Sequence, residues 1–421
     1  MSVLIDIFSI IGEVLFIILR ATWWIVVPVF LFNKVKPLYR FDKVLQYFRG
    51  LEFILLEIKL PPDVLKTPKA MENVMAGLHG AWTDLNFRDR WIKGEVQDQF
   101  SLEMVGTNGE PHFYIRCQAK QRNFVESRIY SQYPDAELEE AEDYTKNLPP
   151  DIPNKDYDLW GSDFIVNNLQ WYPIRTYFDF EDPEEERRLD PISQLAEMIV
   201  QMQDGEHLWI QLIISPILIE VKGKWKEAVD KVLGKEKPAP IGIIAEAADF
   251  IRDIWLVLVE GKEPLGRRQS IIKEPKKMLE LTPGEREAIE AIEQKNSKVG
   301  FFTSIRGVYI GRRDVMNKAN IAGMHGFFRQ YANQNLNSFR PDSKTFPKSS
   351  FVFFPNTRKQ IRKRRIMMAY RGRMLGFLSK PYFLNVEELA SLFHLPGRVV
   401  TAPMMPRTPS RRAEPPRGLP T

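Results

Sequence analysis

Residues Ile7 to Phe32 read IFSIIGEVLFIILRATWWIVVPVFLF, an apolar run whose polar positions are Ser9, Glu13, Arg20 and Thr22. As a helix rising about 1.5 Å per residue it would reach about 39 Å, whereas the hydrocarbon core of a bilayer is roughly 30 Å thick. A signal peptide would be shorter and would begin with basic residues, which the opening MSVLID lacks. A signal peptide and a buried soluble helix are therefore the weaker alternatives, and we expect residues 1–36 to form a transmembrane anchor.

The charges that flank this run predict its orientation. Basic residues follow the run at Lys34, Lys36, Arg40 and Lys43. Because segments rich in Lys and Arg stay on the cytoplasmic side, we expect a single-pass protein of the cell membrane with its N-terminus outside and its bulk in the cytoplasm. Glu13 and Arg20 would lie on one face of the helix and are costly in lipid, which leaves open snorkelling or contact with another membrane subunit.

The composition argues against several classes of active site. Cys117 is the only cysteine, so an internal disulfide framework and a CxxC metal site are excluded, and its place in an alternating strand favours a role as core filler. The five histidines form no closely spaced pair, and no phosphate loop, GxGxxG or GxSxG motif occurs. We therefore expect a protein that is not an enzyme, with no catalytic residue, no metal and no cofactor.

The segment at residues 50–146 has the pattern of a small α+β domain. Its expected elements are a strand at 51–60, a helix from 67, strands at 99–105 and 112–119, a helix at 122–133 and a strand at 136–141. The two middle strands flank Asn108-Gly109, a pair typical of a hairpin turn in which both central residues have positive φ. The order βαββαβ predicts a ferredoxin-like domain with both helices on one face of the sheet.

A similar order recurs within residues 155–400. We expect a strand at 169–180, a helix at 192–202, a strand at 208–215, a helix from Thr282, a strand at 300–310 and a helix at 314–331. Residues 216–281 interrupt the order as a helical insertion, in which 241–259 favours an amphipathic helix on the bilayer or on a partner. The predicted fold class is thus α+β: a transmembrane helix followed by two tandem ferredoxin-like domains, with a proline-rich disordered tail at 401–421.

A strongly basic stretch, TRKQIRKRRIMMAYRGR, occupies residues 357–373. The residues that we expect to contact phosphate groups or a partner are Arg358, Lys359, Arg362, Lys363, Arg364, Arg365, Arg371 and Arg373. Such a density of cations can attract nucleic acid or anionic lipid, and it can equally be a solvated or protein-contacting surface. The neighbouring aromatic run at 351–354 could stack on bases or form a buried strand.

Three segments carry a resemblance to a known family. They are FSLEMVGTNGEPHFYIRC at 100–117, VESRIYSQYPDAELEEAEDY at 125–144 and FLNVEELASLFHLPGRVVTAPMMPR at 383–407. Together they resemble the membrane-anchored N-terminal region that precedes the motor domain in bacterial conjugation or type IV secretion-like ATPases of the HerA/FtsK class. The resemblance covers residues 1–421 in order, and no position matches a nucleotide-binding motif of the motor.

This resemblance implies the function and the partners. We expect a non-enzymatic membrane anchor and docking module of a type IV secretion or conjugation machine, one that recruits a separate cytoplasmic ATPase. The implied partners are the cell membrane, a HerA/FtsK-class ATPase, further copies of the chain in a homo-oligomer, and DNA as a further candidate. Docking to the motor is expected at Leu389, Leu392, Phe393 and His394. The alternative is a membrane-tethered nucleic-acid-binding protein that uses residues 358–373, and a cryptic enzyme is the third and weakest hypothesis.

Overall fold

The computed structural model describes residues 2–61, 66–180, 190–218, 225–234, 281–348 and 354–396. Within the first helix, the side chains that it describes are those of Arg20, Trp23, Trp24 and residues 27–49. The chain divides into two compact units. Unit 1 comprises residues 1–53 and 83–98, and unit 2 comprises residues 54–82 and 99–421.

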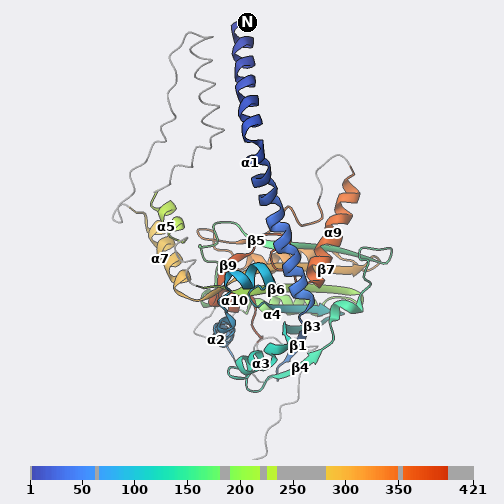
Figure 1. The fold of residues 1–421 in the computed structure, drawn as a ribbon. Helices are drawn as coiled ribbons and strands as arrows, with labels where there is room; N and C mark the ends of the chain where they lie inside the picture. The colour runs from blue at the N-terminus through green and yellow to red at the C-terminus, as the bar shows by residue number, and fades with distance from the viewer. Residues whose placement is uncertain are drawn as a thin grey trace, which may run out of the picture. The chain divides into compact units, whose positions relative to one another are not determined.

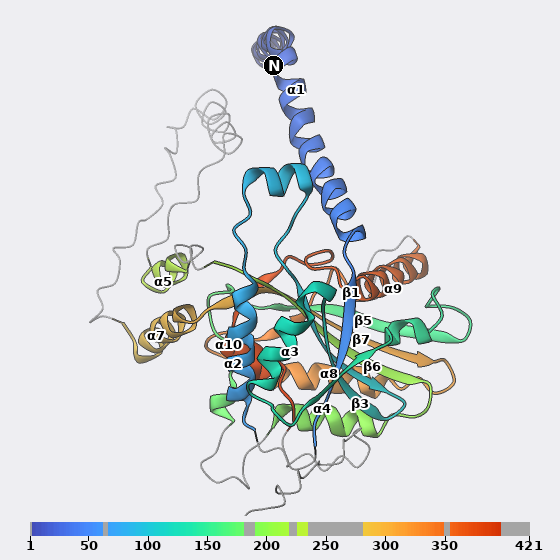
Figure 2. The same cartoon turned by 60° about the horizontal axis from the view of Figure 1, so that its bottom comes forward.

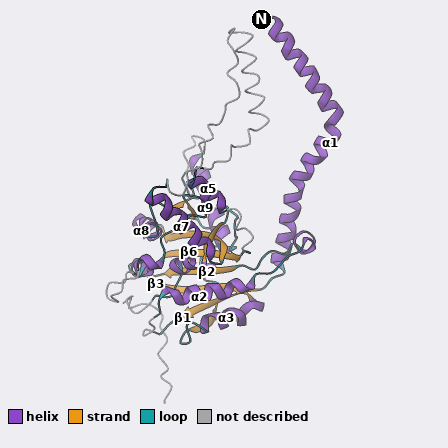
Figure 3. Ribbon diagram, turned by 90° about the vertical axis from the view of Figure 1, so that its left-hand side faces the viewer, coloured by secondary structure: helices purple, strands orange, loops and turns teal. Residues whose placement is uncertain are grey.

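Unit 1 is built on α1, a continuous helix of 48 residues from Ser2 to Arg49. Pro28 and Pro37 lie inside it. A proline in a helix interior removes one backbone hydrogen bond and clashes with the preceding turn, which accounts for the bent course of α1 in Figure 3. The π-helical turn η2, Asp89–Lys93, belongs to the same unit, and its Trp91 ring receives Lys36 Nζ at 4.9 Å from the ring centroid.

The expected transmembrane helix is a prediction that the structure corrects. Among the described residues, none of the helices combines the length and the apolar character that crossing a bilayer requires. Helix α1 does not end where the apolar run ends at Phe32. It continues through Lys34, Lys36 and Arg40 to Arg49. The side chains of residues 1–19 lie outside those that the structure describes, and the predicted orientation and localisation stay predictions.

Unit 2 contains a single antiparallel sheet, which has nine strands in the described part of the chain. The strands are β1 Phe53–Lys59, β2 Phe100–Thr107, β3 Glu110–Gln118, β4 Glu137–Ala141, β5 Tyr157–Val166, β6 Glu206–Pro216, β7 Gly300–Arg312, β8 Phe339–Pro341 and β9 Tyr382–Asn385. Their order is β4-β1-β3-β2-β6-β7-β5-β8, and β9 pairs with β7 beyond the end of β5 (Figure 1). Every residue of the central strand β6 is buried, as expected for a strand covered on both faces.

The prediction of two tandem ferredoxin-like domains is wrong, because the two halves share this one sheet. Strand β2 of the first half pairs with β6 of the second half from Phe100↔Ile214 to Thr107↔His207. An apolar strand left at a sheet edge would offer unpaired backbone groups to other chains, and the pairing of β2 with β6 closes both edges at once. The periodicity of each half locates the strands but does not say which edges meet.

Helices cover both faces of the sheet (Figure 2). The helices on one face are α2 Pro68–Leu78, α3 Arg122–Tyr130, α4 Pro191–Val200, α8 Lys318–Arg329 and α10 Val386–Leu392. The opposite face is covered by α9, Pro355–Arg371, whose Ile366, Met367 and Tyr370 pack on it. Beside them α5, Lys226–Val232, and α7, Pro283–Ser297, enclose a small core with Trp171 and Phe383. Successive residues of β6, such as Trp209 and Ile210, enter opposite cores, as the two-residue period of a strand requires.

Of the predictions made from local sequence patterns, the structure confirms some and shows others to be wrong. Asn108 and Gly109 have φ values of 53° and 87°, which confirms the predicted hairpin turn. The predicted strand at residues 169–180 is wrong: this segment is irregular except for a short 3-10 turn, η5 Tyr177–Asp179, and the strand is β5 instead. Asp158, Gly161 and Asp163 interrupt the apolar pattern of β5 and hide it. Most of the predicted insertion at 216–281 and the whole tail at 401–421 lie outside the described residues.

Candidate functional site

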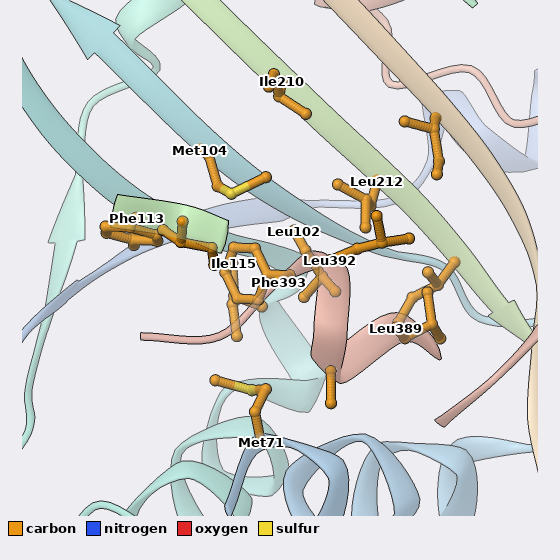
Figure 4. Close-up of a cluster of buried hydrophobic side chains, with 14 of the residues drawn as sticks. Met71, Leu102, Met104, Phe113, Ile115, Ile210, Leu212, Leu389, Leu392 and Phe393 are labelled. Atoms are coloured by element: carbon orange, nitrogen blue, oxygen red, sulfur yellow. The ribbon is translucent and has the colours of Figure 1, made fainter. Parts of the chain in front are cut away.

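The segment expected to dock a motor lies in the core of unit 2. Leu389, Leu392 and Phe393 are fully buried, and His394 is 2% exposed. Figure 4 shows Leu389, Leu392 and Phe393 directed into the apolar cluster with Met71 and the strand residues. Phe393 meets the Phe113 ring edge-on, with 6.0 Å between ring centroids. In this structure the four residues stabilise the core and offer no surface to a partner.

Polar contacts fix the same segment from its two ends. Asn385 and Glu388 form a capping box at the start of α10. The Glu388 carboxylate also lies 3.0 Å from Lys295 Nζ, in a fully buried pair whose desolvation raises the pKa of Glu388 and lowers that of Lys295. At the other end, the two ring nitrogens of His394 lie 2.8 Å from the Ala390 carbonyl oxygen and 3.0 Å from Asp190 Oδ1. Glu388 of α10 and His394, which follows the helix, therefore have structural roles.

Four cations of the basic stretch turn inward. Arg362 donates to the backbone carbonyl oxygens of residues 343, 346 and 348, and Arg371 donates to those of residues 148, 149 and 150. Lys363 Nζ lies 2.5 Å from Asp158 Oδ1. Arg373 is 4% exposed and pairs with Glu103 at 3.0 Å and Asp143 at 2.6 Å. These four residues hold α9 and its neighbouring loops to the sheet.

The outward members of the stretch remain candidates for contact with an anion. Arg358, Arg364 and Arg365 are exposed, and Lys359 is half-buried. The structure thus divides the eight predicted contact residues into an inward and an outward group.

A buried polar network under α9 is a feature that the sequence analysis missed. Burial alone would raise the pKa of Glu103, but Arg373, Ser101 and Tyr144 outweigh it and hold this pKa below its usual value. On the neighbouring strands Arg306 Nε donates to Asp163 Oδ1 at 2.8 Å. Each charge has an opposite charge or several donors beside it, which is what a buried charge needs to be stable. The signal was present in FSLEMV, where a carboxylate interrupts an apolar strand.

Burial changes the protonation of two side chains that could take part in chemistry, Cys117 and His207. Burial raises the pKa of the Cys117 thiol to about 12, so at neutral pH it is protonated and a poor nucleophile. In this part of the chain no three His, Cys, Asp or Glu residues gather as a metal site would require. Burial also lowers the pKa of His207 to about 4, and the imidazole is neutral at pH 7.

The surface of α1 exposes large apolar side chains, whereas the cores of unit 2 bury them. Phe30, Phe32 and Leu38 are 59%, 65% and 67% exposed, and Trp23 and Trp24 are exposed as well. Cations follow the exposed aromatic residues along the helix, and Lys34 Nζ lies 5.6 Å from the centroid of the Phe30 ring. This apolar and basic surface of α1 is a candidate functional site, in addition to the outward cations of the basic stretch.

A comparison with protein families identifies the family of the chain. A model described as "Domain of unknown function (DUF8128)" matches residues 54–407. The chain belongs to the DUF8128 family. No curated protein matches the sequence.

The DUF8128 match includes every described strand and helix of unit 2 after the first residue of β1. The buried network, the basic stretch and the core segment of α10 all fall within it. Helix α1 precedes the match, so its exposed surface lies outside the part of the chain that defines DUF8128.

Proposed function

We propose that this protein is a non-enzymatic membrane-attachment and docking module of a type IV secretion or conjugation-like translocation machine, which recruits a separate ATPase. One observation carries the attachment: the exposed apolar surface that surrounds α1. Val29, Phe30, Leu31 and Phe32 are four consecutive residues, and all are more than half exposed. Consecutive helical residues point about 100° apart, so these four encircle the helix. A one-sided protein partner would leave part of this surface in water, whereas lipid would cover all of it.

The charges beside this surface favour an anionic membrane. Lys34, Lys36, Arg40 and Lys43 follow the aromatic residues within three turns. A basic residue near an anionic lipid surface contributes about 1 kcal/mol, and tryptophan rings prefer the headgroup level. Attachment of this kind requires that the apolar side chains around α1 insert among the lipids.

The recruitment of an ATPase rests on the resemblance of the segments at 100–117, 125–144 and 383–407. Since Leu389 and Phe393 are core residues, we expect the docking surface to lie elsewhere on unit 2, and the core segment to hold that surface in shape. A module of this design would keep a motor at the membrane through many weak contacts, multiplied when several copies assemble.

Flotation with lipid vesicles tests the attachment. The full chain should float with vesicles of phosphatidylcholine and phosphatidylserine. Changing Trp23, Trp24 and Phe30 together to Gln should abolish flotation, whereas changing the exposed residues Tyr130, Leu169 and Ile361 to Gln should leave it intact. Equal behaviour of the two triple variants would contradict attachment through α1.

A separate experiment tests the recruitment. An ATPase should co-purify with the chain from its native cells, and deletion of the chain should release that ATPase from the membrane fraction. An ATPase that stays on the membrane after deletion would exclude the recruiting role while leaving the attachment untouched.

The alternative function, nucleic-acid binding, is favoured by the outward cations of the basic stretch. Changing Lys359, Arg364 and Arg365 to Gln should weaken a salt-dependent shift of DNA if this alternative holds, because each phosphate contact releases counterions. Unchanged binding would exclude it.

A further inference from the structure

An open cavity of about 660 Å³ lies at the edge of the sheet beside β5. Its walls come from β5 at Asp158, Leu159 and Trp160, from α8, and from Lys359 and Lys363 of α9. Strand β5 pairs with β7 along Tyr157–Phe164, but its other side pairs with β8 only at Phe164–Val166. The cavity therefore adjoins the part of β5 that β8 does not cover. Its volume is within the range of about 300 to 1,000 Å³ that is usual for small-molecule sites.

The lining of this cavity has a surplus of positive charge. Lys318, Arg329, Lys359 and Lys363 line it, and Asp158 is the one acidic residue among its lining residues. Asp158 is already neutralised, because Lys363 Nζ lies 2.5 Å and Arg313 Nη1 3.4 Å from its carboxylate oxygens. Within the described part of the chain, Lys318, Arg329 and Lys359 have no carboxylate at ion-pair distance. Lys318 and Arg329 stand at opposite ends of α8, about 16 Å apart along its axis, so each end of the cavity offers a cation to an anion.

One wall of the cavity is aromatic. The ring centroids of Trp160 and His325 lie 4.9 Å apart, and both residues line the cavity. Burial and the nearby Arg329 lower the pKa of His325, so the imidazole is neutral at pH 7 and keeps one donor and one acceptor nitrogen. Met316 and Ile321 add apolar surface beside these rings. A flat ring can pack here while a charged group reaches the cations.

We propose that this cavity binds a nucleotide, with the base against Trp160 and His325 and the phosphates at Lys359 and at Lys318 or Arg329. A nucleotide combines the two properties that the lining offers to a ligand: an aromatic ring with hydrogen-bonding edges, and a multiply charged phosphate group. The nucleotide is either free or one unit of a single strand. This proposal concerns unit 2 alone and is independent of membrane attachment.

Calorimetric titration of the full chain tests the site, with ATP, GTP, a 12-residue oligothymidylate and inorganic tripolyphosphate as the probes. We expect saturable binding of at least one nucleotide probe, and weaker binding of tripolyphosphate because it lacks a base. Tighter binding of the oligothymidylate assigns the site to a strand, and tighter binding of ATP or GTP assigns it to a free nucleotide. Absence of saturable binding for all three nucleotide probes, or tightest binding of tripolyphosphate, would overturn the proposal.

A matched pair of variants separates the cavity from the general charge of the protein. Lys318→Gln with Arg329→Gln removes two cations that line the cavity, and Lys226→Gln with Lys231→Gln removes two exposed cations of α5 that do not. The first variant should weaken nucleotide binding by about tenfold or more, since each lost cation would donate a charge-assisted hydrogen bond to a phosphate oxygen. The second should change it by less than about twofold at physiological salt. Equal losses in the two variants would show that only non-specific charge is at work and would overturn the site.

Trp160→Leu should weaken ATP or oligothymidylate binding more than tripolyphosphate binding, and thermal unfolding of each variant checks that the fold is kept.

Discussion

Helix α1 and helix α10 are both rich in apolar side chains, yet the structure treats them in opposite ways. All seven residues of α10 are buried, including Glu387 and Glu388. On α1, by contrast, large apolar residues such as Trp24, Phe32 and Leu38 are more than half exposed. The difference shows that apolar composition alone does not distinguish a core element from an attachment element. What decides is whether neighbouring elements of the chain cover the side chains.

The comparison also reverses the roles that the sequence suggested for the C-terminal segment. Leu389 and Phe393 were expected to meet a partner, but they already have one in α2 and the sheet. In the described residues of unit 1, η2 contacts α1 at Lys36 and Arg40, whereas Val29 to Phe32 are more than half exposed. The same substitution should therefore damage folding in one helix and attachment in the other.

The largest effect on stability should come from the buried charges that lie between α9 and the sheet of unit 2. Arg373→Gln would leave Glu103 and Asp143 without their cation, and we expect a loss of about 3 to 5 kcal/mol in the free energy of unfolding. Urea unfolding followed by circular dichroism measures it. Arg364→Gln, an exposed change of the same type, should cost less than about 0.5 kcal/mol. Similar costs for both would mean that the network does not bear on stability.

A matched pair of leucines compares the two helices directly. Leu389→Ala should lower the free energy of unfolding by about 2 to 5 kcal/mol, because it opens a cavity in a filled core. Leu38→Ala should leave the unfolding of unit 2 unchanged, since Leu38 is 67% exposed. Urea unfolding followed by circular dichroism measures the free energy of unfolding of both variants. A large loss for Leu38→Ala would break the comparison, because it would place α1 in a folded core.

The cores of unit 2 should also make it sensitive to acid. The pKa of His207 is lowered by burial from 6.5 to about 4, so between these values the unfolded state binds a proton that the folded state does not. Stability therefore falls as the pH drops from about 6.5 to 4, by at most about 3 kcal/mol. The carboxylates of Glu103 and Asp143, whose pKa values are lowered, add a loss at still lower pH. Urea midpoints measured across this range should fall, and His207→Gln should flatten the part above pH 4.5. An unchanged slope in this variant would assign the effect to other groups.

The sequence predicted local structure better than it predicted the meeting of elements. The turn at Asn108-Gly109 and the start of a helix at Thr282 depend on a few neighbouring residues, and both are confirmed. The pairing of β2 with β6 joins segments about a hundred residues apart, and no local pattern records it. For that reason two separate domains were expected where there is one sheet.

The basic stretch holds a signal that could have been used. Arg362 and Lys363 precede the buried residues Ile366 and Met367 by four positions, and so they lie on the same side of α9. Their inward contacts follow from this spacing. The partner of Arg373 could not be found in this way, because Glu103 lies 270 residues earlier and the two meet only through the sheet.

Membrane attachment depends on what surrounds α1, and a fluorescent label on this helix can report its environment directly. Cys117 is buried and poorly reactive, so a cysteine introduced at an exposed position can be labelled selectively in the full chain. An environment-sensitive dye should be attached after Phe30→Cys in one sample and after Ile361→Cys in another, each mixed with anionic vesicles that carry a lipid-bound quencher. We predict a blue shift and strong quenching at position 30 and no change at position 361. An unchanged spectrum at position 30, with the vesicles in excess, would contradict membrane attachment through α1.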